Sequence, residues 1–126
     1  MSEQKKSLYE RLGGYDAISA VCTELLVRLR ASSQLGRFWA NRGDDGIARE
    51  KQLLVDFLCN AAGGPMYYTG RPNKLSHKGM GVSASDWSIF TGILKSVLDD
   101  FEVKGPEQDD VLGFIQSTRA DIVEVD

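Results

Sequence analysis

The amino-acid sequence predicts an all-α protein. Apolar residues recur at helical spacing in four long segments, glycine and proline separate these segments, and no stretch alternates apolar and polar residues for long enough to form a strand. The chain has 126 residues, of which 42% are hydrophobic and 26% are charged, so we expect one compact domain spanning residues 1–126.

The N-terminal third is expected to form a short helix and then a long one. Residues 8–12 allow one or two turns before the Gly13-Gly14 pair breaks them. The long helix begins near Asp16, an acidic residue suited to a helix start. Its apolar side has the i, i+4, i+7, i+11 spacing and consists of Ile18, Cys22, Leu25 and Leu29.

Two aromatic residues and a second long helix follow. Phe38 and Trp39 lie in a short segment, residues 35–40, that ends in a polar run at residues 41–45. A helix is expected over residues 47–62, because the following Gly-Gly-Pro supplies a left-handed cap and then a residue that cannot continue a helix. The apolar side of this helix consists of Leu54, Phe57, Leu58 and Ala61.

The C-terminal half shows the clearest helical signal. An aperiodic stretch at residues 66–73 is expected to be a loop, followed by a short helix at residues 74–80. Ser83 and Asp86 then form an S-x-x-D capping box. The helix behind it has a 3.6-residue apolar face made of Ile89, Phe90, Ile93, Leu94, Val97, Leu98 and Phe101. The last helix opens at Pro106, and its apolar side consists of Val111, Ile115, Thr118 and Ile122.

Composition and charge exclude several classes of protein. The net charge is −3 and no stretch is strongly basic, which argues against a nucleic acid or a membrane as partner. No apolar run approaches the roughly 18 residues of a bilayer span, and the N-terminus has no signal-peptide core, so we expect a soluble cytoplasmic protein. Cys22 and Cys59 lie far apart and outside any CxxC, and are expected to be reduced and buried.

Familiar catalytic motifs are absent from the sequence. It contains no P-loop, no HExxH and no dinucleotide-binding glycine motif. One histidine and two separated cysteines make a poor zinc site, and the absence of CxxCH excludes covalent c-type haem. His77 is either an ordinary structural histidine or a metal ligand. The large aromatic residues could line a cavity or simply form core; they are Phe38, Trp39, Phe57, Tyr68 and Phe90.

Four segments taken together resemble the group I truncated haemoglobins over nearly the whole chain. They are LYERLGG at residues 8–14, QLGRFW at residues 34–39, the stretch from DFL to GGP at residues 56–65, and YTGR at residues 68–71 leading to His77. The resemblance implies a truncated globin-like two-over-two helical sandwich. In it, the helices near Asp16 and Ile47 form one antiparallel pair, the last two helices form the other, and haem lies between the pairs.

The same resemblance implies haem b (iron protoporphyrin IX) as the cofactor, with His77 as the proximal ligand of the iron. The second imidazole nitrogen of His77 would donate to a backbone carbonyl within residues 73–76. Phe38 or Trp39 would pack against the porphyrin, and Tyr68, Lys74 and Lys78 are candidates for its propionates. The full set of expected haem contacts is Phe38, Trp39, Leu54, Phe57, Tyr68, Lys74, Lys78, Val82, Phe90 and Ile93.

The distal side departs from the pattern of the family. Many members have a tyrosine and a glutamine that donate hydrogen bonds to dioxygen, but this chain has Leu26 and Leu54, with Glu50 one turn earlier. An ionised Glu50 only accepts hydrogen bonds. Gln52 is the alternative donor if the register differs by a few residues, and Lys51 is an alternative sixth ligand. We therefore expect faster dioxygen loss and easier autoxidation than in the members of the family that have the tyrosine.

The resemblance implies reversible binding of small diatomic gases: dioxygen, carbon monoxide or nitric oxide. Nitric oxide dioxygenation, which needs a separate reductase, and gas sensing are further roles that the family suggests. We expect a monomer or a weak homodimer. A haem-free helical protein-interaction module is the alternative of another class. A cysteine-based redox protein would need an accessible thiol at Cys22 or Cys59.

Overall fold

The computed structural model describes residues 7–40, 43–64 and 80–125. Within these ranges the regular elements are α-helices and one 3-10 helix, and the sole β pairing is an isolated parallel bridge between Ser83 and Val125. The bounds are α1 Leu8–Leu12, α2 Gly14–Ala31, η1 Leu35–Trp39, α3 Asp44–Ala61, α5 Ala84–Asp100, α6 Pro106–Ser117 and α7 Arg119–Ile122. The predicted all-α class is confirmed.

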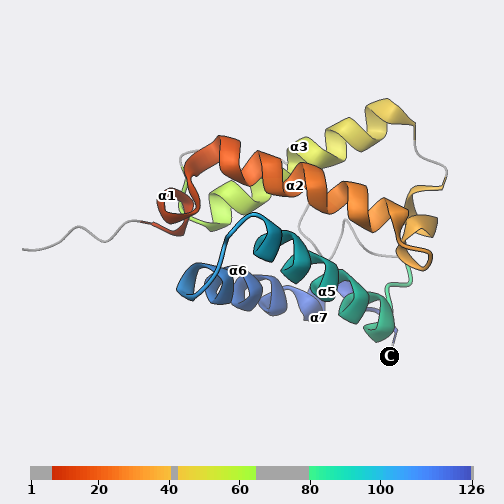
Figure 1. Ribbon diagram of the computed structural model, residues 1–126. Coiled ribbons are helices and arrows are strands. Elements are labelled where there is room, and N and C mark those ends of the chain that lie inside the picture. The colour runs from red at the N-terminus through yellow and green to blue at the C-terminus, as the bar shows by residue number, and fades with distance from the viewer. Residues whose placement is uncertain (1–6, 41–42, 65–79, 126) are drawn as a thin grey trace, which may run out of the picture.

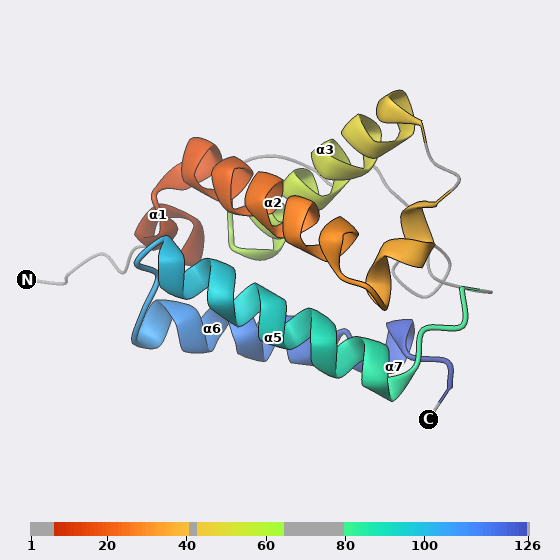
Figure 2. The same cartoon turned by 45° about the vertical axis from the view of Figure 1, so that its right-hand side comes forward.

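The long helices form two layers. Helix α2 crosses α3 in one layer, and α5 lies beside α6 in the other (Figure 1). Turning the molecule shows that α2 also runs over α5, so that it touches both layers (Figure 2). The main core lies between the layers and includes Leu25, Leu29, Leu94, Leu98 and Ile115. Each such side chain contributes about 1.5–3 kcal/mol when it is fully buried.

The first helix has a cap that the sequence analysis missed. The Ser7 hydroxyl accepts a hydrogen bond from the Glu10 backbone N–H at 3.2 Å, while the Glu10 carboxylate accepts from the Ser7 N–H. Gly13 and Gly14 both have positive φ, so the chain turns sharply and α2 starts at Gly14 rather than near Asp16. All four residues of the predicted apolar stripe of α2 are buried, as expected.

Helix α3 starts three residues earlier than predicted, at Asp44. Asp44 and Asp45 lie in its first turn, where negative charge is stabilised by the helix dipole. This explains why part of the polar run is helical. The predicted apolar side is incomplete: Val55 and Cys59 are the fully buried residues, whereas Ala61 is exposed. Val55 and Cys59 pack against α2, which makes α3 apolar on two sides.

The glycine pair after α3 is a docking point for α1. Gly63 adopts φ +92°, and the Gly64 N–H donates to the Cys59 carbonyl at 2.8 Å, which closes the helix. A Cβ on Gly64 would lie 2.6 Å from the Tyr9 ring, so only glycine allows this approach. The Tyr9 N–H also donates to the Ala62 carbonyl at 2.9 Å. The predicted cap therefore also fastens the N-terminal helix.

Helix α5 begins at the predicted capping box of Ser83 and Asp86. At its other end, Phe101 is the C-cap and is 39% exposed, so this residue does not extend the buried face as predicted. The Val103 N–H donates to the Leu98 carbonyl at 2.8 Å, which forms a Schellman turn. Glu102 has φ +63° in this turn, at the position that usually holds glycine.

The predicted last helix is divided in two. Thr118 separates α6 from α7, and its hydroxyl donates to the Ile115 carbonyl at 2.7 Å. After α7 the chain returns to the start of α5: the Glu124 N–H donates to the Val82 carbonyl at 2.8 Å, and the Ala84 N–H donates to the Val125 carbonyl at 2.9 Å. The C-terminal residues thereby hold the segment that precedes α5.

Glu102→Gly is expected to stabilise the protein by about 1 kcal/mol, because glycine adopts the left-handed conformation without the steric cost of a Cβ. The exposed 3.6 Å ion pair between Glu102 and Lys104 contributes little that would be lost. The midpoint of urea unfolding should rise while the slope stays unchanged. Gly105→Ala at φ +68° should do the opposite. Glu102→Gln keeps the Cβ, and an equal gain in that variant would show that charge rather than strain is responsible.

Candidate functional site

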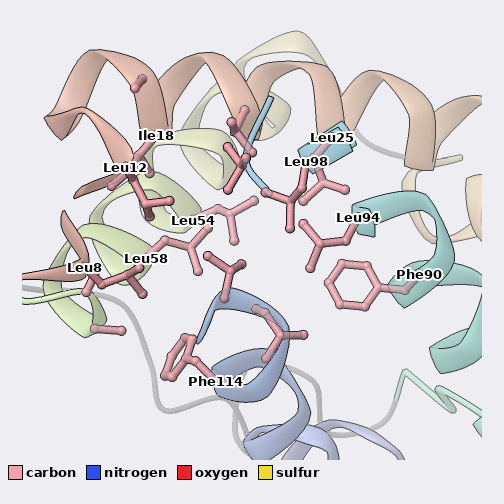
Figure 3. Close-up of a pocket in the computed structure, with 17 residues that line it drawn as sticks. Leu8, Leu12, Ile18, Leu25, Leu54, Leu58, Phe90, Leu94, Leu98 and Phe114 are labelled. Carbon is pink, nitrogen blue, oxygen red and sulfur yellow. The ribbon is translucent and has the colours of Figure 1, made fainter. Parts of the chain in front are cut away.

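An apolar cavity of about 60 Å³ lies between the two helix layers. Its lining residues come from α1, α2, α3, α5 and α6. Figure 3 shows the side chains converging on it, with Leu25 on α2, Leu54 and Leu58 on α3, Leu94 on α5 and Phe114 on α6. α1 contributes Leu8 and Leu12. The cavity is thus a product of the layered packing.

The chemistry of the cavity favours small apolar molecules over water. The described residues that line it are all alanine, valine, leucine, isoleucine or phenylalanine. A buried water needs two to four polar partners, and these side chains offer none. An apolar space of this kind favours small uncharged molecules over water.

Two of the expected haem contacts lie directly at this cavity. Leu54 and Phe90 both line it, from α3 and α5 respectively. Ile93 is half-buried and packs against the main core. Val82 is buried, with its carbonyl held by the C-terminal residues as described above.

A further aromatic contact was missed in the sequence analysis. Phe57 of α3 packs on Phe114 of α6, with ring centroids 5.6 Å apart. Phe114 also lines the cavity. It lies three residues after Val111, so the helical periodicity of the last segment contained the signal. Trp87 is likewise buried and three residues before Phe90, on the face already recognised in α5.

The aromatic residues of η1 lie at the junction with α3. The Phe38 and Trp39 rings meet edge to face with centroids 6.4 Å apart, and both pack against the main core. The Trp39 indole Nε1–H donates to the Glu50 carboxylate at 2.9 Å. Glu50 therefore accepts a hydrogen bond from one of the aromatic residues that are expected to contact haem.

A buried carboxylate fastens η1 to α5. Asp86 is 1% exposed, and its carboxylate accepts hydrogen bonds from Gln34 at 2.6 Å, from Arg37 at 2.7 and 3.1 Å, and from the Ser83 backbone at 3.0 Å. The Arg37 guanidinium, and then the Gln34 and Ser83 donors, hold the pKa of Asp86 well below its usual range against the opposing effect of burial.

The distal residues occupy different environments. Leu26 is buried in the main core beside Leu25 and Leu29. Gln52, the alternative donor, is exposed, and its amide donates to the Tyr15 hydroxyl at 2.7 Å and to Asp56 at 3.0 Å. Its amide is therefore engaged on the surface between α2 and α3. Lys51 is half-buried on the same helix.

Four of the expected site residues lie outside the described residues: Tyr68, Lys74, His77 and Lys78. The expected short helix at residues 74–80 lies outside them too, except for Met80, which is exposed. Among the residues that the structure does describe, no three His, Cys, Asp or Glu side chains gather as a metal site. Nor does any helix in the described ranges have the length and apolarity to cross a membrane.

The two cysteines are free and fully buried, as predicted. Burial, with a smaller effect from the nearby Cys59, raises the pKa of the Cys22 thiol to about 12. Burial also raises the pKa of Cys59. A protonated, inaccessible thiol is a poor nucleophile, so a cysteine-based redox function has no support in this geometry.

Comparison with known proteins identifies the family. The profile of the bacterial-like globin family matches residues 7–124. The group 1 truncated haemoglobin GlbN of Mycolicibacterium paratuberculosis is 32% identical over 116 residues, which cover 92% of this chain and 83% of that protein. The chain belongs to the group 1 truncated haemoglobins. GlbN of a Nostoc species is 33% identical, over 82% of this chain and 83% of its own length.

Solved structures give the same fold. A variant of the truncated haemoglobin of Tetrahymena pyriformis aligns with a TM-score of 0.86 and 25% identity, over 94% of this chain and 98% of that one. The 2/2 haemoglobin of Synechococcus, solved in the cyanomet state with covalently attached haem, aligns with a TM-score of 0.81 and 26% identity, again over 94% and 98%. The predicted two-over-two sandwich is confirmed, and membership in this family implies a haem cofactor.

The described residues suit a haem group. A porphyrin needs apolar and aromatic walls, which Leu54, Phe57 and Phe90 provide, together with the edge-to-face pair on η1. Since the described ranges contain no histidine, an axial imidazole would have to come from His77, the single histidine of the chain.

Asp86 is expected to make the stability of the protein sensitive to acid. Because its pKa is lowered in the folded state, its contribution is fully present above the ordinary aspartate range near pH 4 and is lost as the pH falls further. Asp86→Asn should lower the free energy of unfolding at pH 7 by about 2 kcal/mol. The loss of stability between pH 5 and pH 2 should then be shallower than in the wild type. Urea unfolding followed by circular dichroism, repeated at several pH values in this range, measures the free energy of unfolding of both proteins. If the free energy falls equally with pH in the wild type and the variant, Asp86 is not the source of the acid sensitivity.

Proposed function

We propose that this protein binds haem b through His77 and uses it to bind small diatomic gases reversibly. When it is bound, the group supplies an iron with an open coordination position for such a gas. The observation that carries the proposal is the apolar cavity between the helix layers, lined by the expected haem contacts Leu54 and Phe90.

Different side chains of the protein would have different roles in binding haem. Leu54, Phe57, Phe90 and Ile93 would exclude water from the cofactor, which slows oxidation of a ferrous iron. His77 would ligate through one imidazole nitrogen, while a backbone carbonyl in residues 73–76 fixes the ring by accepting from the other. Tyr68, Lys74 and Lys78 would meet the propionates. The apolar cavity would hold an uncharged gas molecule beside the haem.

The distal side favours ligands that need no hydrogen bond. Leu26 and Leu54 carry no polar atom, Glu50 accepts from Trp39, and the Gln52 amide is engaged on the surface. A dioxygen ligand would draw negative charge from a ferrous haem iron and would need a nearby donor, whereas carbon monoxide and nitric oxide would depend on a donor much less. The protein is therefore better suited to binding or sensing these gases than to nitric oxide dioxygenation, which also requires a separate reductase.

Reconstitution with haemin tests the proposal. The purified wild type should take up one haem b and, after dithionite, give a five-coordinate ferrous absorption spectrum. His77→Ala should lose this spectrum, and added imidazole should restore an axial nitrogen ligand. Circular dichroism controls for folding.

Three other outcomes would overturn parts of this proposal. Failure of the wild type to take up haem would leave the haem-free interaction module as the better interpretation. A six-coordinate ferrous spectrum would point to an internal ligand such as Lys51. An unchanged spectrum in His77→Ala would remove His77 as the ligand.

Leu26→Tyr is expected to slow dioxygen dissociation about tenfold or more, because the new hydroxyl adds a donor worth roughly 1.5–3 kcal/mol to a partly charged ligand. Leu26→Phe is the matched control, since it adds the ring to the same buried site without the hydroxyl. Stopped-flow displacement of dioxygen by carbon monoxide measures both rates. Equal rates in the two variants would show that position 26 does not face the bound gas.

A further inference from the structure

Asp86 is more deeply buried and more fully paired than a helix cap requires. The capping box needs only the contacts between Asp86 and Ser83. The same carboxylate also receives two hydrogen bonds from Arg37 and one from Gln34, both outside α5. A carboxylate that is 1% exposed is costly to bury unless it is paired, so Arg37 is held strongly in this position.

Arg37 connects this carboxylate to the aromatic residues. Its guanidinium carbon lies 4.2 Å from the centroid of the Phe38 ring, a cation–π distance. The guanidinium thus contacts the buried carboxylate and the ring at once. A lysine could not match both contacts, because it lacks the planar fork of donors.

The contacts continue from Phe38 to α3. Phe38 packs edge to face on Trp39, and the Trp39 indole donates to Glu50. An unbroken series of contacts therefore runs from the start of α5, through η1, to the first half of α3. Trp87, next to Asp86 in the sequence, lies outside this series because its indole N–H donates to Gln116 at 3.3 Å.

We propose that Asp86 is a positioning residue for the haem wall, by which we mean the aromatic pair Phe38 and Trp39. Asp86 sets the placement of this pair through Arg37, and it sets the placement of Glu50 through Trp39. This inference rests on the proposed haem function, in which Phe38 and Trp39 are expected contacts. The Asp86 carboxylate is hydrogen-bonded to Arg37, Gln34 and Ser83, so its link to the two aromatic residues runs through Arg37. Its role is to hold η1, and with it the haem wall, against α5. Haem retention therefore depends on a residue that is not itself an expected haem contact.

The first test needs no haem. The chain has two tryptophans, so a ¹H–¹⁵N spectrum of the full protein contains two indole signals, which Trp39→Phe assigns. If the protein carries haem, the diamagnetic ferrous carbon monoxide form is used. In Asp86→Asn, solvent exchange of the Trp39 indole proton should become about tenfold faster, while that of Trp87 changes less than about twofold.

The second test measures cofactor retention. Asp86→Asn and Arg37→Gln should each release haem to an acceptor protein about tenfold faster, and the double variant should lose no more than either single variant, because both act through one contact. The Arg37 side chain is 50% exposed, so Arg37→Gln is expected to fold. This variant therefore still tests the proposal if Asp86→Asn fails to fold. Asp99→Asn is the matched control: Asp99 also accepts hydrogen bonds, from Gln108 and Lys95, but at the other end of α5.

The outcomes separate this inference from the proposed function. Equal acceleration at both indoles would mean that Asp86 only caps α5, and an unchanged Trp39 signal would break the proposed series of contacts; either result overturns the inference. Additive effects on haem release would overturn it too. Failure of the wild type to bind haem would refute the proposed function and the role in the wall, while the indole exchange would still report whether Asp86 positions Trp39.

Discussion

Helix α2 is buried on two sides at once, and the arrangement of the other helices follows from this. Ile18 and Cys22 meet Val55 and Cys59 of α3, whereas Leu25 and Leu29 belong to the core shared with α5 and α6. One helix therefore joins both layers. Hydrophobic burial itself has no preferred direction, so the angle between the layers is set by how the side chains interdigitate and by the polar contacts that join the helices.

Specific backbone and polar contacts supply that direction at the two ends of the molecule. At one end, the glycine pair after α3 lets the Tyr9 ring approach closely, and Arg11 of α1 pairs with Glu107 and Asp110 of α6 at 3.3 and 2.9 Å. At the other end, the Asp86 carboxylate joins η1 to α5. The apolar cavity lies between these two sets of contacts, where side chains from five helices meet without filling the space.

The two ends differ in the strength of their polar contacts. The Arg11 pairs are solvent-accessible and add little to stability, because water and salt screen them. The Asp86 contacts involve a buried charge, so removing one partner leaves the other desolvated and unpaired. The end of the molecule that carries the expected haem wall is therefore the one held by an interaction that is costly to break.

The sequence by itself determined the helical class, the four long helices, the glycine breaks and the capping box of α5. These are local properties: an apolar period, a left-handed cap or a Ser side chain acts within a few residues of its own position. Local pattern also identified two of the residues that meet the cavity, since Leu54 and Phe90 both belong to predicted apolar faces. The order of the motifs indicated the family before any fold was known.

Only the tertiary structure decided which residues act together. It turned α3 into a helix with two apolar sides, because α2 covers Val55 and Cys59 while Leu54 and Leu58 face the cavity. It paired Trp39 with Glu50, brought Phe114 to Phe57, and buried Asp86 under Arg37. No periodicity encodes these pairs, because their members lie 11, 57 and 49 residues apart in the chain. They exist because two layers of helices meet at one fixed angle, and that angle is a property of the packed molecule.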